Sequence, residues 1–321
     1  MNFEKLIHYA ALAPSGHNTQ PWKFSVHGNH IRIHPDFSRS LPVVDPDNHA
    51  LFISLGCALE NLIIAAQHDG YSSSVNYFPN DKEYLEAKLT ERSPTDDDEL
   101  FRVISKRQSN RSLYNGESIP DSHIKLLTSA VDSSSTTLRI FQTGHEGAEQ
   151  IIRLVKEATR IQFRNDDFVE ELISWIRFSK QEAVEEKDGL TSEAMGFPSV
   201  PGWLGKTIIR KFATPEGEAK KCEKMIRSSP NLIVFIAGSK SKKDWVDLGR
   251  NFQRVSLIAT KLGISHAHLN MPCEIESVKE KFSEFLNLKK NEEPLLLIRL
   301  GYSKEMPKSP RRNLDEIIKN I

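Results

Sequence analysis

Residues 55–70 read LGCALENLIIAAQHDG, and residues 248–263 read LGRNFQRVSLIATKLG. Both stretches open on Leu-Gly, continue as an apolar helix and end at a glycine. A proline then follows at the same distance in each, at Pro79 and Pro272. Matching landmarks at one fixed offset indicate an internal repeat. The repeat predicts two related halves fused in one chain, although helix–glycine–strand units also recur by chance in α/β proteins.

The sequence around the repeat predicts helices interleaved with short strands. Apolar residues at helical spacing predict a helix over 3–13, and Gly28-Asn29 predicts a hairpin between strands 23–27 and 30–34. Asp47 stands where the first repeat helix needs an N-cap. Residues 146–187 should be helical. Residues 188–215 are rich in Gly and Pro and predict a long irregular loop.

Composition excludes several kinds of partner. The 321 residues contain 43 Lys plus Arg and 43 Asp plus Glu, so no global field attracts nucleic acid or an acidic membrane. The three cysteines are scattered and lack metal spacing, which indicates a reducing compartment. The most apolar stretch, 51–66, is too short to span a bilayer. We expect a cytoplasmic globular protein that binds neither nucleic acid nor membrane.

Three further segments carry candidate binding residues. Residues 13–22 read APSGHNTQPW, residues 107–111 read RQSNR, and residues 307–312 read PKSPRR after an apolar strand, LIRLGY, at 297–302. Arginine forks suit a phosphate because they donate paired, charge-assisted hydrogen bonds. On residue types alone, the basic tail is equally well explained as solvated, and 107–111 as a surface loop between helices.

Taken together, these segments resemble motifs of the FMN-dependent nitroreductase family. Residues 13–22 resemble its Pro-Ser-x-x-Asn-x-Gln-Pro-Trp motif, residues 107–111 its Arg-x-Ser-x-Arg motif, and the tail its C-terminal phosphate-binding segment. The double-length arrangement is similar to the two-copy branch that includes the Acg-like proteins of mycobacteria. The resemblance implies an α+β, nitroreductase-like three-layer sandwich: a mixed or antiparallel sheet flanked by helices, with the two halves forming an intrachain pseudo-dimer.

The resemblance also implies a site made from both halves. Its cofactor-binding residues would be Pro14, Ser15 and Asn18 from the first half, with Arg107, Ser109, Arg111, Lys308, Arg311 and Arg312 from the second. Where the second half should repeat the opening motif it reads DSSSTTL at 132–138, without Pro, Asn or Trp. We therefore expect at most one FMN per chain. Phe197 and Trp203 in the long loop could cover the flavin, and Trp22 should pack in the core.

The implied function is an NAD(P)H-dependent FMN oxidoreductase that reduces a nitro, quinone or similar small acceptor. No protein catalytic residue is required, because the flavin carries the hydride. The alternative is an FMN-binding storage or stress protein with little turnover. We expect a first half over 1–95 and a second over 96–321, with a lid-like insertion at about 160–215. The protein would be a monomeric pseudo-dimer or a homodimer.

Other chemistries lack support in the sequence. It contains no Gly-x-Ser-x-Gly, no P-loop and no Gly-x-Gly-x-x-Gly, which removes the usual hydrolase, NTPase and Rossmann signatures. His27, His30 and His34 flank the predicted hairpin. Their loose spacing favours alternating strand residues over a metal site.

Overall fold

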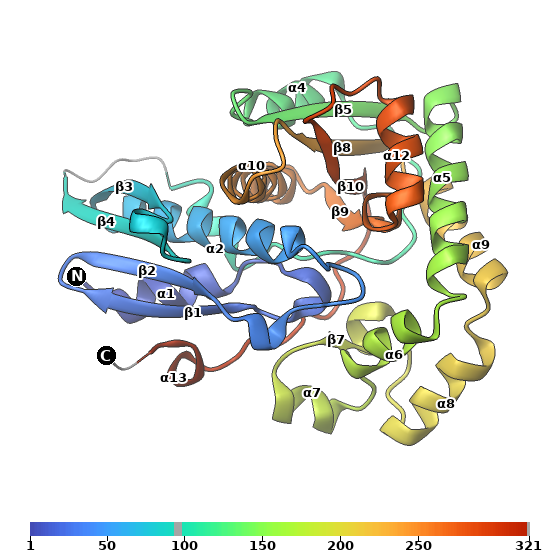
Figure 1. The fold of residues 1–321 in the computed structure, drawn as a ribbon, viewed down its shortest axis with the longest axis horizontal. Helices are drawn as coiled ribbons and strands as arrows, with labels where there is room; N and C mark the ends of the chain where they lie inside the picture. Colours follow the sequence, from blue (N-terminus) through green and yellow to red (C-terminus); the bar gives the residue numbers. More distant parts are fainter. Residues whose placement is uncertain (93–97, 320–321) are drawn as a thin grey trace.

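The computed structural model describes residues 1–92 and 98–319, and two long helices cross at its centre between two sheets (Figure 1). The first half contains α1 (Phe3–Ala11), β1 (Trp22–His27), β2 (His30–Pro35), α2 (His49–His68), β3 (Tyr71–Tyr77) and β4 (Leu85–Glu91). Short 3-10 turns lie at Gly16–Asn18, Phe37–Arg39 and Pro79–Asp81. A short helix, α3 (Phe101–Ile104), leads into the second half.

The second half repeats this order around a large insertion. Its shared elements are α4 (Asp121–Ser129), β5 (Thr136–Gln142), β8 (Asn231–Ala237), α10 (Lys242–Lys261), β9 (Ser265–His268) and β10 (Glu293–Gly301). Between β9 and β10 lie two helices, α11 (Met271–Glu274) and α12 (Glu276–Phe285), where the first half has only the turn at Pro79–Asp81. Between β5 and β8 lie α5 (Glu146–Gln162), α6 (Asp166–Ser174), β6 (Ile176–Arg177), α7 (Lys180–Glu186), β7 (Leu190–Thr191), a 3-10 turn at Glu193–Met195, α8 (Gly202–Phe212) and α9 (Pro215–Arg227). The chain ends on α13 (Leu314–Ile317).

Sheet topology confirms that the two halves are related. The first sheet has the order β1-β2-β4-β3 and the second β5-β8-β10-β9, and every pairing in both is antiparallel. The orders become identical when β1, β2, β3 and β4 are matched to β5, β8, β9 and β10. The α+β class implied by the resemblance and the fused pair of halves predicted from the repeat are therefore correct.

The repeat glycines mark the point where the two central helices touch. A Cβ on Gly56 would lie 2.1 Å from the Val246 carbonyl oxygen, and one on Gly249 would lie 2.0 Å from the Ile53 carbonyl oxygen. Only glycine permits such a close backbone approach. The two contacts mirror one another, so the Leu-Gly pair at the start of each repeat serves the pseudo-symmetric interface.

The sheets differ in how their faces are covered. In the second half, Ile233 and Phe235 belong to the central core with α2 and α10, whereas Leu232 and Val234 pack with α5, α9 and α12. Alternate residues of a strand point to opposite faces, so this sheet is the middle of three layers. α2 is long and apolar enough to cross a membrane, but 94% of that window is buried inside this fold.

A buried ion-pair network also ties α2 to α10. Glu60 is 1% exposed and accepts hydrogen bonds from Arg250 Nε at 3.0 Å and Arg254 Nε at 3.0 Å. We expect Glu60→Gln to lower the free energy of unfolding by about 2 kcal/mol, because the buried carboxylate that both partly exposed guanidinium groups share is lost. Urea denaturation followed by circular dichroism measures this.

The exposed pair Glu99–Lys261 provides the matched control for Glu60. Both of its side chains are at least 40% exposed, so Glu99→Gln should change stability by less than about 1 kcal/mol. Equal effects of the two substitutions would show that burial of Glu60 does not decide its contribution.

Several local predictions need correction. Helix α2 is capped by Asp45, whose carboxylate accepts from the backbone N–H groups of Ala50 and Leu51 at 2.9 Å each; Asp47 instead bonds His49. The expected irregular loop 188–215 contains a helix, α8. The proposed boundary between residues 95 and 96 lies outside the described residues.

Candidate functional site

The first half, the second half and the tail meet at a cavity of about 90 Å³. Eight of the nine predicted cofactor residues line it: Pro14, Ser15, Asn18, Arg107, Ser109, Arg111, Lys308 and Arg311. The remaining residue, Arg312, does not. It faces away, with Nη1 4.0 Å from Asp36 Oδ2, and its backbone N–H donates to Gln20 Oε1 at 2.9 Å.

The opening motif forms one side of the cavity through an unusual backbone. His17, Asn18 and Gln20 have φ values of 45°, 56° and 52°, which few non-glycine residues adopt. Ser15 stabilises the turn, because its Oγ accepts from the backbone N–H of Gln20 at 2.9 Å. Backbone in this sparsely populated region is often retained at functional sites. Trp22, fully buried, then begins β1 as expected.

Side chains of the motif hold the insertion and the tail in place. Asn18 Nδ2 donates to the carbonyl oxygens of Gly189 at 3.1 Å and Pro310 at 3.2 Å. Gln20 Nε2 donates to the Lys187 carbonyl oxygen at 2.9 Å. The same motif that shapes the cavity therefore ties together segments far apart in the sequence.

Arg107, Gln108, Ser109 and Arg111 also line this cavity. Arg107 is 7% exposed, and its Nε and Nη1 are buried without a hydrogen-bond partner among the described residues. Gln108 Nε2, also on the cavity wall, and His17 Nδ1 are unpartnered in the same sense. Native proteins pair almost all buried polar atoms, so the unpaired nitrogens of Arg107 and Gln108 on this wall fit a site that donates hydrogen bonds to a bound group.

Arg311 lines the same cavity as Arg107. Its guanidinium donates to carbonyl oxygens at the end of α1, those of Ala11, Leu12 and Ala13, and to Asn18 Oδ1 at 3.0 Å. It forms no ion pair with any described residue. Burial lowers the pKa of Arg107 to about 10 and that of Arg311 to about 9; for Arg311 repulsion by Arg107 adds to the effect. The site therefore concentrates uncompensated positive charge.

The arginine side chains of this cavity suit the phosphate of FMN, whereas the cavity volume is small for the flavin ring. Arg107 offers two unpartnered nitrogens, and Arg311, whose nitrogens already donate to carbonyl and amide oxygens, adds positive charge without an ion-pair partner; together they suit a dianion. A cavity of about 90 Å³ is smaller than the roughly 300–1,000 Å³ usual for small-molecule sites. Leu190 and Ala194 of the insertion form its wall, so an entire flavin requires this wall to lie further out.

The lining by Leu190 and Ala194 was missed in the sequence, where Phe197 and Trp203 stood as the expected cover. Those two aromatics are 54% and 72% exposed. They line neither this cavity nor the second cavity, of about 470 Å³, between the insertion and the C-terminal tail. Gln108 was also missed, although it lies inside the quoted RQSNR segment. The insertion residues carry no local signal, because only the fold brings them to the motif.

Comparison with known proteins gives relatives of the whole chain. "Putative NAD(P)H nitroreductase Rv3131" of Mycobacterium tuberculosis is 23% identical over 321 residues, covering 96% of this chain and 88% of its own. "Putative NAD(P)H nitroreductase acg" from the same organism is 21% identical, covering 97% and 93%. The chain is similar over its full length to the Acg-like nitroreductases.

Solved structures of shorter proteins are similar to part of this chain. The FMN-dependent nitroreductase NfnB of Mycobacterium smegmatis, solved with NADPH, has a TM-score of 0.46 and 13% identity, covering 70% of this chain and 98% of its own. A Bacteroides fragilis nitroreductase with bound FMN has a TM-score of 0.40 and 17% identity, covering 65% and 90%. No family model matches the chain.

Histidines behind the site should make stability pH-dependent. His266 is 1% exposed, its Nε2 is unpartnered among the described residues, and burial followed by repulsion from Arg107 holds its pKa well below 6.5. Below pH 6.5 the unfolded histidine binds a proton that the folded one does not, so acid favours unfolding. Between pH 7.5 and 5 we expect His266 to remove up to about 2 kcal/mol of stability.

The measurement compares wild type with His266→Gln by urea denaturation at both pH values. His17 and His268, with pKa values lowered to about 4 and about 3 mainly by burial, act in the same direction in both proteins. The variant should therefore lose less stability on acidification than wild type. Identical losses would contradict a neutral, buried His266.

Proposed function

We propose that this protein is an FMN-dependent oxidoreductase of the nitroreductase type that takes a hydride from NAD(P)H and passes it to a small nitro, quinone or similar acceptor. The observation that carries the proposal is buried Arg107, which has two unpartnered nitrogens and lines one cavity with Arg311 and residues of the 13–22 motif. The full-length similarity to proteins named as NAD(P)H nitroreductases supports the same activity. The three described cysteines form no disulfide bond, which is consistent with a cytoplasmic location.

Each residue of the site would have a distinct binding role. Arg107 and Arg311 would hold the phosphate of FMN, with Lys308 at the rim adding charge. Ser15, Asn18 and Ser109 would offer polar contacts to the cofactor, and Pro14 would shape the turn against it. Arg111, whose pKa is lowered by burial and then by Arg299, would place positive charge where reduced flavin becomes anionic.

FMN, when bound, supplies the redox chemistry, so the protein needs no nucleophile or general base of its own. What the chain contributes is binding, orientation and exclusion of water. Eight predicted binding residues line a single cavity, and the 132–138 segment lacks the motif residues for a second one. We therefore propose one FMN per chain.

The test is a flavin absorbance titration followed by anaerobic reduction. Purified protein mixed with FMN should retain about one flavin per chain after desalting, and NADH or NADPH should bleach the flavin band. Reoxidation by a nitroaromatic or a quinone should then restore it. Binding without bleaching would contradict the reductase proposal, and failure of folded protein to bind FMN would contradict the site itself.

A further inference from the structure

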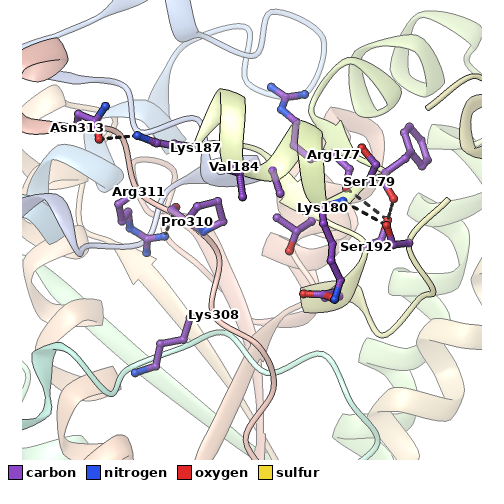
Figure 2. A pocket seen from close by; sticks show the side chains of 15 residues that line it. Arg177, Ser179, Lys180, Val184, Lys187, Ser192, Lys308, Pro310, Arg311 and Asn313 are labelled. Atoms are coloured by element: carbon purple, nitrogen blue, oxygen red, sulfur yellow. Dashed lines mark hydrogen bonds and ion pairs between the residues drawn. The ribbon is translucent and has the colours of Figure 1, made fainter. Parts of the chain in front are cut away.

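A second cavity of about 470 Å³ lies between the insertion and the C-terminal tail, outside the nine proposed FMN residues except for Lys308 and Arg311 (Figure 2). Its volume falls within the range of small-molecule sites. The insertion side runs from Arg177 to Ser199, and the tail side from Lys308 to Asn313. The cavity shares Lys308 and Arg311 with the flavin site, so the two lie side by side.

The charge around this second cavity is strongly positive in a protein whose formal net charge is zero. Two arginines and three lysines line it, namely Arg177, Arg311, Lys180, Lys187 and Lys308, against one carboxylate, Glu193. Arg177 pairs at 2.6 Å with Asp188, a carboxylate that it shares with Arg39, and Lys180 pairs with Glu193 at 3.0 Å. The other three cations face no carboxylate within the described part of the chain.

The uncompensated cations are held only by neutral groups. Lys187 Nζ donates to Asn313 Oδ1 at 2.8 Å, and Lys308 Nζ donates to the Ser105 carbonyl oxygen at 2.6 Å. In the proposed flavin site, Arg107 and Arg311 already supply two positive charges for the phosphate of FMN, which carries about two negative charges. Lys308 lines both cavities, whereas Lys187 lines only the second one, so the charge of Lys187 remains for a second anion.

The walls of the cavity are apolar enough for a ring system. Phe178 and Ala183 line the insertion side, and Val184 and Pro310 stand on opposite walls, on α7 and on the tail (Figure 2). Val184 is 68% exposed, so its apolar surface is accessible to a ligand in the cavity. Apolar walls with a lysine rim suit an aromatic group that carries a phosphate.

We propose that this cavity binds the phosphorylated adenosine end of NADPH, with Lys187 near the 2′-phosphate, so that the protein prefers NADPH to NADH. The proposal rests on the reductase function, because only a hydride donor must reach the neighbouring flavin site. The adenine would lie between Val184 and Pro310. Since NADH lacks the 2′-phosphate, it would leave Lys187 without an anionic partner.

The experiment measures binding without turnover. Adenosine 2′,5′-bisphosphate and 5′-AMP are titrated by calorimetry into FMN-loaded protein, with flavin content read by absorbance in each sample. Wild type should bind the bisphosphate at least about tenfold more tightly than 5′-AMP, and high salt should reduce the difference. Lys187→Gln should remove most of that preference, and Val184→Trp, which fills the cavity, should weaken both ligands.

The matched control is Lys206→Gln. Lys206 lies on α8 of the same insertion, is exposed and lines neither cavity, so this variant should bind like wild type. Equal binding of the bisphosphate and 5′-AMP to wild type, or an unchanged preference in Lys187→Gln, would overturn the proposal. A protein that lacks FMN but still prefers the bisphosphate would contradict the reductase function while supporting the cavity as a nucleotide site.

Discussion

Arg107→Met should make the apoprotein more stable and should weaken FMN binding by about a hundredfold. The guanidinium is buried, has two unpartnered nitrogens and forms no ion pair with a described residue. Replacing it with an apolar side chain of similar length removes a desolvation penalty, which we expect to raise the free energy of unfolding by about 1–2 kcal/mol. The lost charge-assisted bonds to phosphate account for the lower affinity.

Two measurements on Arg107→Met test the expected gain in stability and the expected loss of FMN affinity. Urea denaturation of flavin-free protein gives the stability, and a flavin fluorescence titration gives the dissociation constant. Arg102→Met is the matched control, because Arg102 is exposed on α3, close to Arg107 in the chain; it should leave FMN binding unchanged. If Arg107→Met destabilised the apoprotein, Arg107 would be structural, and the phosphate role would lose its physical basis.

Gly56→Ala should cost more than about 3 kcal/mol of stability. Most overpacking substitutions cost about 1–3 kcal/mol, because side chains can rearrange. Here the added methyl group would meet backbone atoms: the Val246 carbonyl oxygen at 2.1 Å and the Arg250 nitrogen at 3.1 Å. Relief requires α2 and α10 to move apart, which loosens the core between the halves. Thermal and urea unfolding measure the loss.

Gly217→Ala separates this effect from the usual consequence of removing a helical glycine. Gly217 lies in the first turn of α9, and its added Cβ would lie 2.9 Å from the hydroxyl of Thr214, the N-cap residue, and near no backbone atom of another element. Alanine is favoured over glycine in helices by about 1 kcal/mol, which offsets the adjustment of this one side chain, so the control should stay within about 1 kcal/mol of wild type. A Gly56→Ala protein as stable as wild type would mean that the two helices do not depend on this crossing.

The repeat could be read from the sequence because its determinants are local. Gly56 and Gly249 occupy equivalent places in their helices, and the glycines and prolines that follow recur at the same spacing. The identical strand order in the two sheets follows from that duplication. The motif residues were likewise identifiable, since each group is contiguous in the chain.

The insertion was harder to predict, because its glycines have a packing role. Gly202 and Gly205 suggested an irregular loop, yet both lie in α8. A Cβ on Gly205 would lie 2.1 Å from the Phe178 ring, so the position requires glycine for close approach and not for flexibility. The wall formed by Leu190 and Ala194 depends on contacts such as Asn18 to Gly189, which local patterns do not encode.

Because α2 and α10 belong to one chain, their packing has a different concentration dependence from that of an interface between two subunits. An interface between two separate subunits weakens on dilution, because its formation is second order in protein. Here both helices, the 13–22 motif and the tail that carries Arg311 belong to one polypeptide. The assembly of the site is therefore unimolecular and independent of protein concentration. Because the two halves are covalently linked, they stay paired even when their sequences diverge.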